Sequence, residues 1–135
     1  MTHKFVAVLN PKYPVPRLLN ALGHVTAGLG ARNERAPMGF VDYRDSAGGT
    51  YPNISAFPFI VLEGSSNHLR KFRQALLDAK LEHTCFLDTM LEGGSDAQVA
   101  KTAQTPPAQL DFVAICAFAL REALDPLTKK FSLWK

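Results

Sequence analysis

The chain has little cysteine and no long apolar run. Its 135 residues contain two cysteines, Cys85 and Cys116, and each lies inside an apolar run. Cysteines in such runs favour reduced core thiols over a disulfide. No stretch approaches the ~18 apolar residues of a membrane span, and the run before Pro11 is too short for a signal peptide. We therefore expect a cytoplasmic protein with no part in a membrane.

The chain also lacks the spacing of a metal or nucleotide-phosphate motif. Its four histidines show neither the i, i+4 pairing nor the partner cysteines of a metal site. The stretch 42–48 resembles a calcium loop only loosely, because the oxygen spacing is wrong and no terminal glutamate follows. Gly93-Gly94-Ser95 precedes a predicted helix, but no Gly-Lys-Ser/Thr follows, which excludes a P-loop. We predict no metal and no cofactor.

What the sequence does contain is typical of a globular domain. Hydrophobic residues make up 47% and charged residues 20%, and the length fits a single domain over residues 1–135. The net charge of +3 is compatible with an anionic partner without requiring one.

Strand and helix patterns alternate along the chain. Near-continuous apolar runs indicate strands buried on both faces, which need helices on both sides. The fold class predicted is α/β, a three-layer α/β/α sandwich around a mixed sheet of about four strands. The predicted strands are Lys4–Leu9, Phe59–Leu62, Thr84–Leu87 and Phe112–Phe118, with a short one at Phe40–Tyr43. The predicted helices are Arg17–Leu29, Asn67–Lys80, Asp96–Ala103, opened by a capping box of Ser95 and Gln98, and a fourth from Asp125-Pro126.

The helix over Arg17–Leu29 has an unusual polar side. Its apolar stripe consists of Leu18, Leu22, Val25 and Leu29. The side away from that stripe is predicted to carry Arg17, Asn20, Ala21, His24 and Gly28. Small residues allow close approach, and the polar groups can bind what approaches. Two alternatives stay open: segment 32–58 packs on this side, or a functional cleft lies there.

Several segments together resemble a known family. These are Lys4–Leu9, the Pro14-Val15-Pro16 crossing, the helix Arg17–Gly30 with His24, and the ending Asp125–Lys135. They resemble a family of short uncharacterised proteins, a domain of unknown function, whose fold is similar to the type II peptidyl-tRNA hydrolases. The resemblance covers nearly the whole chain and implies that fold here.

The resemblance also implies where a site would lie. In the hydrolases a lysine at the first turn of this helix belongs to the active site, and Arg17 stands there. A glutamine one turn further is replaced by Ala21, whereas their histidine matches His24. Their aspartate and threonine lie one turn apart in a later loop, which Asp88-Thr89 resembles in region but not in spacing. We take His24 and Asp88 as candidate catalytic residues and Arg17, Asn20 and Thr89 as candidate ligand-binding residues.

These substitutions change the chemistry that the site could perform. Arginine stays protonated and can clamp an anion, whereas a desolvated lysine can act as a base. His24 is the better titrating group near neutral pH. The basic side of the second helix carries His68, Arg70, Lys71 and Arg73 and could contact a phosphate backbone.

Three functional hypotheses remain open. The first is binding of a small anionic or nucleotide-linked ligand, or of RNA, at the first-helix face. The second is hydrolysis of peptidyl-tRNA or a related ester or amide, so whether the chain is an enzyme stays uncertain. The third is a noncatalytic interaction protein or homodimer.

Two structural expectations complete the sequence account. The apolar C-terminal residues Phe131, Leu133 and Trp134 are predicted to dock on the body of the protein. A single core is predicted from Phe5, Val8, Leu22, Ile60, Leu62, Phe72, Leu76, Phe86, Val113, Ile115 and Phe118.

Overall fold

The structure is a computed structural model that describes residues 2–32 and 38–135. In these residues the helices are α1 (Val15–Arg32), α2 (Ser66–Asp78), α3 (Ser95–Ala103) and α4 (Arg121–Leu124). The strands are β1 (His3–Leu9), β2 (Phe40–Arg44), β3 (Thr50–Ser55), β4 (Phe59–Glu63), β5 (His83–Leu87), β6 (Phe112–Leu120) and β7 (Ser132–Leu133). Short 3₁₀ turns follow as η1 (Asp88–Met90), η2 (Pro107–Gln109) and η3 (Asp125–Leu127). Among the described residues no helix has the length and apolar character needed to cross a membrane.

Five strands form a mixed sheet in the order β5-β6-β1-β4-β7. β1 pairs in parallel with β4 and antiparallel with β6, and the outer pairs β5–β6 and β4–β7 are antiparallel. The four main strands expected from the apolar runs are confirmed. The fifth strand, β7, was not predicted, because two residues are too few to show a strand pattern.

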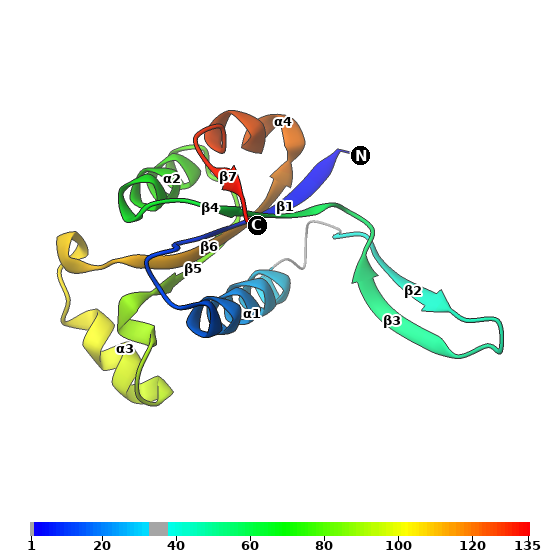
Figure 1. The fold of residues 1–135 in the computed structure, drawn as a ribbon, viewed down its shortest axis with the longest axis horizontal. Helices are drawn as coiled ribbons and strands as arrows, with labels where there is room; N and C mark the ends of the chain where they lie inside the picture. Colours follow the sequence, from blue (N-terminus) through cyan, green and yellow to red (C-terminus); the bar gives the residue numbers. More distant parts are fainter. Residues whose placement is uncertain (1, 33–37) are drawn as a thin grey trace.

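The two faces of the sheet are covered by different helices (Figure 1). Side chains alternate along β1, so Phe5, Ala7 and Leu9 pack with α1 on one face. Val6 and Val8 point to the other face, where α2 and α4 cover them. The three layers follow from strands that are apolar on both sides, as the sequence predicted.

The residues predicted to form the core are buried or partly buried, but they do not form a single core. Nine of the eleven residues are buried, and Leu22 and Ile60 are partly buried against them. The set divides into two clusters, one on each face of the sheet. The prediction of one core was therefore wrong, because residues on opposite faces of a central sheet do not meet.

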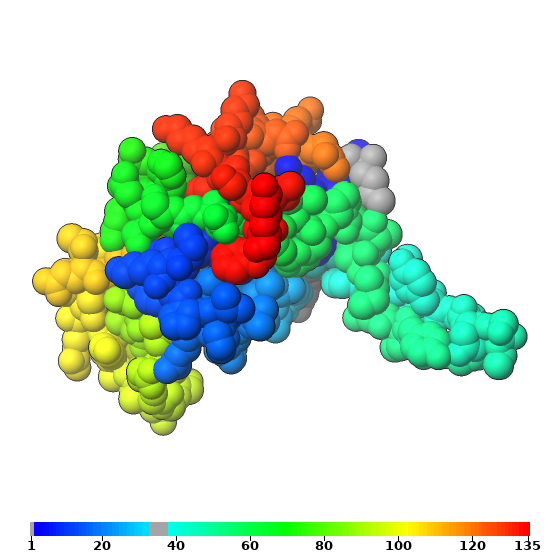
Figure 2. Space-filling view, viewed as in Figure 1, coloured from blue at the N-terminus to red at the C-terminus, as the bar shows by residue number. Residues whose placement is uncertain are grey.

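Residues 40–55 form a hairpin that projects from the body (Figures 1 and 2). The short strand at Phe40–Tyr43 is confirmed. β3 was not predicted, because it contains Pro52 and proline is unusual inside a strand. Next to it, Asn53 adopts a φ of 77° where the pairing with β2 is irregular. The part of segment 32–58 in this hairpin points away from the body, and residues 33–37 lie outside the described residues.

The C-terminal end is docked as expected. The ring of Phe131 meets that of Phe72 edge-on at 5.4 Å between centroids, and Trp134 donates its backbone N–H to the Val61 carbonyl at 3.0 Å. Leu133 is exposed, although it pairs with β4 through its backbone. The fourth helix begins at Arg121, not at Asp125, which opens the turn η3 instead.

Candidate ligand-binding cleft

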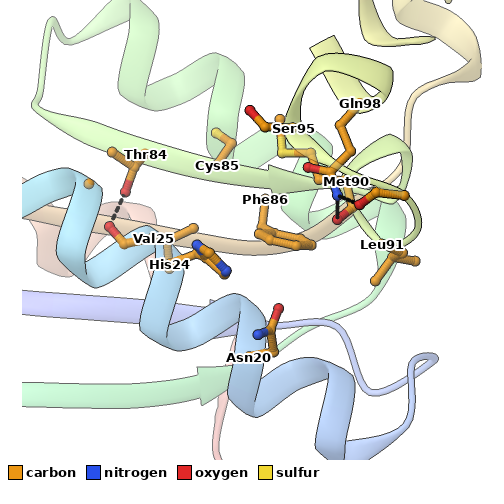
Figure 3. A pocket seen from close by; sticks show the side chains of 12 residues that line it. Asn20, His24, Val25, Thr84, Cys85, Phe86, Met90, Leu91, Ser95 and Gln98 are labelled. Atoms are coloured by element: carbon orange, nitrogen blue, oxygen red, sulfur yellow. Dashed lines mark hydrogen bonds between the residues drawn. The ribbon is translucent and has the colours of Figure 1, made fainter. Parts of the chain in front are cut away.

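A cavity of about 660 Å³ lies between α1, the end of β5 and the segment that runs from η1 into α3. We call it the α1–α3 cleft. Figure 3 shows its side chains converging from three parts of the chain. Those used below are Asn20, His24, Thr84, Phe86, Met90, Leu91, Ser95 and Gln98.

The orientation of α1 sets one wall of the cleft. Leu18, Val25 and Leu29 are buried against the sheet as predicted. Ala21 is also fully buried, so its placement on the polar side was wrong. At 100° per residue Ala21 lies only about 70° from the centre of the apolar stripe, so its small side chain can extend that stripe. Arg17 and His24 therefore flank the buried stripe, whereas Asn20 lies nearly opposite it.

A hydrogen bond fixes α1 to the edge strand beneath the cleft. The hydroxyl of Thr84 donates to the carbonyl of Val25 at 2.6 Å, which Figure 3 draws. At Gly28 an added Cβ would lie 3.6 Å from the Thr84 methyl, an ordinary van der Waals contact. This bond holds α1 against β5. Asn20 and His24, which precede Val25 in α1, line the open cleft.

His24 and Asn20 are the polar side chains that α1 presents to the cleft. Both are exposed, and Figure 3 shows them directed toward β5 and the η1 segment. The His24 ring lies 5.8 Å from the ring of Phe86, between centroids. An imidazole beside an aromatic ring and an amide one turn away can together hold a planar or polar ligand group.

Arg17 lies beside the cleft and is already engaged. Its guanidinium donates to the Leu91 carbonyl at 2.7 Å and forms an ion pair with Glu92. These contacts tie the start of α1 to the loop before α3. Arg17 is 45% exposed in its side chain, so it stays accessible from solvent.

Asp88 and Thr89 are placed differently from His24 and do not line the cleft. The Asp88 carboxylate accepts from the backbone N–H of Asp111 at 3.1 Å, which joins the ends of β5 and β6. Thr89 is buried, and its hydroxyl lies 2.6 Å from that of Thr102 on α3. Both side chains hold the η1 turn in place.

The start of α3 forms the wall that faces α1. Its N-cap is Gly94, which offers no side chain, so the predicted capping box of Ser95 and Gln98 was wrong. The Gln98 amide instead donates to the carbonyls of Met90 at 3.0 Å and Gly93 at 2.9 Å. Gly93 has a φ of +83°, which favours glycine at this bend.

Several lining residues were missed from the sequence. Phe86, Met90 and Leu91 come from the end of a strand and the turn after it, which carry no recognisable motif, and Gln98 comes from α3, where the sequence assigned it only a capping role. The available signal was the Gly93-Gly94 pair before a predicted helix. This pair indicates a bend in the chain, but it does not indicate that the bend faces α1.

The lining of the cleft contains few titratable groups. No carboxylate belongs to the lining found among the described residues, and His24 is its titratable polar group apart from the thiol of Cys85. The Cys85 thiol packs against the apolar residues on the face of the sheet that α2 covers. Burial raises its pKa to about 11. Burial likewise raises the pKa of Cys116 to about 12, and both cysteines are free. Neither sulfur is a ready nucleophile.

Metal ligands do not gather in the part of the chain that the structure describes. There, no group of three or more His, Cys, Asp or Glu side chains is placed to hold an ion.

Comparison with known proteins shows the family of the chain and a solved structure with a similar fold. No curated protein matches the chain. A solved structure of the protein of unknown function Atu0240 from Agrobacterium tumefaciens strain C58 has a TM-score of 0.86 and 23% identity, covering 100% of this chain and 99% of that one. At that identity the likeness concerns the fold alone. Residues 3–135 match the family DUF2000, described as a protein of unknown function. The chain therefore belongs to the DUF2000 family of uncharacterised proteins.

Proposed function

We propose that the chain, acting as a single domain, binds a small anionic or nucleotide-linked ligand in the α1–α3 cleft. The observation that carries this proposal is the cleft itself: about 660 Å³ in which His24 and Asn20 face apolar side chains, with no carboxylate in the lining that the described residues form. Cavities of roughly 300–1,000 Å³ with a few convergent polar groups are the usual form of small-molecule sites.

The two walls of the cleft suit different parts of such a ligand. Phe86, Met90 and Leu91 offer an apolar surface on which an aromatic base can pack. His24 and Asn20 offer donors to a phosphate or carboxylate, and a protonated His24 adds charge. Arg17 can join them once its pairing with Glu92 opens, since an arginine fork matches phosphate geometry.

A second candidate function is hydrolysis of an ester or amide on a nucleotide-linked substrate. It is favoured by the position of His24 on the cleft wall, together with the proposed likeness of the fold to type II peptidyl-tRNA hydrolases. In this alternative His24 acts as the base. Asp88 would act indirectly, because its carboxylate is bonded to the backbone of Asp111.

The binding proposal is tested with 5′-AMP as the probe. We expect millimolar AMP to raise the melting temperature of the wild type, because a ligand that binds only the folded state stabilises it by mass action. His24→Ala and Asn20→Ala should lose most of that rise. Asn67→Ala is the matched control, since Asn67 is an exposed amide at the start of α2, on the other face of the sheet.

The expected pattern is a rise in the wild type and the control that is reduced in both cleft variants. No rise in the wild type, or an equal rise in all four proteins, contradicts binding in the α1–α3 cleft.

A further inference from the structure

A second cavity, of about 310 Å³, lies between α2 and the segment that follows η3. We call it the basic pocket. His68 and Lys71 line it from α2, and Lys129 and Lys130 line it from the C-terminal segment. Its apolar surface includes Phe72 and Phe131. α2 packs on the face of the sheet opposite to α1, so this pocket is separate from the α1–α3 cleft.

No ion pair found among the described residues involves the three lysines of this pocket. The ion pairs of the described residues are Lys4–Asp125, Lys12–Asp111, Arg17–Glu92 and Arg32–Glu82. None of them involves Lys71, Lys129 or Lys130, and the described residues place no carboxylate in the lining of the pocket. The nearby Asp125 already accepts from Lys4. Like charges gathered in this way repel each other, and a bound anion relieves the repulsion.

Only part of the basic side of α2 belongs to this pocket. Arg70 donates to the Pro107 carbonyl at 3.2 Å and to the Leu110 carbonyl, which ties it to the η2 turn. Lys71 faces the C-terminal segment instead. Arg70 and Lys71, which were expected on one exposed side of α2, therefore contact different parts of the protein.

The C-terminal segment is held on both sides of its two lysines. Before them, the Thr128 hydroxyl donates to the Leu124 carbonyl at 3.2 Å. After them, the Phe131 backbone N–H donates to the Thr128 carbonyl at 3.2 Å, and the Phe131 ring packs edge-on against Phe72. Figure 2 shows this segment, in orange and red, lying against the body of the protein. Lys129 and Lys130 are thus presented by a turn with fixed ends.

We propose that the basic pocket binds a small organic phosphate whose apolar or aromatic body packs against Phe131 and its apolar neighbours. Three lysines and His68 supply donors and charge for the phosphate, and lysine is a common phosphate ligand. The apolar surface favours an organic phosphate over the inorganic ion. A volume of about 310 Å³ suits a ligand with one ring or a short chain.

Phenyl phosphate is the probe, and its binding is measured by calorimetry at low and high salt. Wild type should bind it saturably and more weakly at high salt, because partly exposed charges are screened. Lys71→Gln should weaken binding about tenfold, as expected for one charged hydrogen bond. The double change Lys129→Gln with Lys130→Gln should weaken it further.

Two controls separate this pocket from general charge and from the phosphate group alone. Lys101→Gln removes one exposed lysine from α3 and should not change the affinity for phenyl phosphate. Inorganic phosphate should bind more weakly than phenyl phosphate.

The proposal is overturned if wild type does not bind phenyl phosphate, or if Lys101→Gln weakens binding as much as Lys71→Gln. Equal affinity for inorganic phosphate contradicts the role of the apolar surface. If a short single-stranded RNA binds through the same lysines while phenyl phosphate does not, the pocket is an RNA contact and not a small-ligand site.

Discussion

Arg17 and Glu92 form an ion pair that joins the first turn of α1 to the loop before α3. The same guanidinium also donates to the Leu91 carbonyl at 2.7 Å. This arginine therefore links the two walls of the α1–α3 cleft at one end. It also means that an anionic ligand must compete with Glu92 for the guanidinium.

The first prediction concerns that competition. Glu92→Gln should strengthen AMP binding several-fold, because it removes the charge that competes for Arg17 and leaves the rest of the cleft intact. Affinity is measured by calorimetry. Glu122→Gln is the control, since Glu122 is an exposed glutamate of α4 outside the cleft. An unchanged or weaker affinity in Glu92→Gln would show that Arg17 does not contact the ligand.

The second prediction concerns the C-terminal end. Deletion of residues 131–135 removes β7, the contact between Phe131 and Phe72, and the bond from Trp134 to Val61. We expect a loss of ~1–2 kcal/mol and a melting temperature lower by several degrees. Thermal unfolding followed by circular dichroism measures this. An unchanged melting curve would contradict the docking of the tail.

A less drastic variant tests the same contact. Gly64 lies directly against the Phe131 ring, so the Cβ of Gly64→Ala would displace that ring. We expect a smaller loss of stability than the deletion gives. Gly30→Ala is the control, because no atom of the described residues outside its own helix backbone lies within 4 Å of the added Cβ.

The structure explains which parts of the fold were predictable. Strands such as β6 are apolar along their whole length, and helices such as α2 show a regular stripe, so pattern alone located them. The hairpin strand β3 and the two-residue β7 have no such pattern. β7 depends on pairing with β4, which is distant in the sequence, whereas β3 pairs with the nearby β2 but contains Pro52 and an irregular register.

The candidate site was predictable only on one side. His24 and Asn20 could be identified because polar residues among small ones are unusual on a helix. The opposite wall depends on how the η1 turn brings Met90 and Leu91 across to α1, and no local motif encodes that approach. Ala21 was misplaced because a small apolar residue fits either side of a helix.

The third prediction concerns acid stability and Asp111. Burial raises the pKa of this carboxyl, but hydrogen bonds from Tyr13, Ser66 and Lys12 outweigh it and leave the pKa below its ordinary value of 3.8. A lowered folded-state pKa contributes stability above the ordinary value, and this contribution is lost as the pH falls through the lowered one. Burial and the bond to Asp111 also raise the pKa of Tyr13.

Asp111→Asn should therefore be less stable than wild type at neutral pH, with the difference shrinking below about pH 4. Urea unfolding at several pH values measures it. Asp42→Asn, in the exposed hairpin, should show no comparable loss at neutral pH. A difference between wild type and Asp111→Asn that is constant across this pH range would show that the charge of Asp111 does not stabilise the fold.

The fourth prediction concerns catalysis. We expect little or no turnover of peptidyl-tRNA, since Arg17 and Ala21 stand where the resemblance to the hydrolases would place their lysine and glutamine, and even a shared fold would not fix the chemistry. Ala21 is moreover buried in the core and cannot reach a substrate. The assay compares wild type, Arg17→Lys and His24→Ala. Robust wild-type turnover abolished in His24→Ala would support the hydrolase alternative instead.

The most direct test of the account is to locate a bound ligand by nuclear magnetic resonance, using ¹⁵N-labelled wild type titrated with AMP. Ligand binding in the α1–α3 cleft predicts saturable shifts concentrated at Asn20, His24 and Ser95. The resonances of Lys71 and Lys129, in the basic pocket, report independently on the second site. Shifts that are absent from the cleft residues, whether or not they occur in the basic pocket, would contradict the central claim.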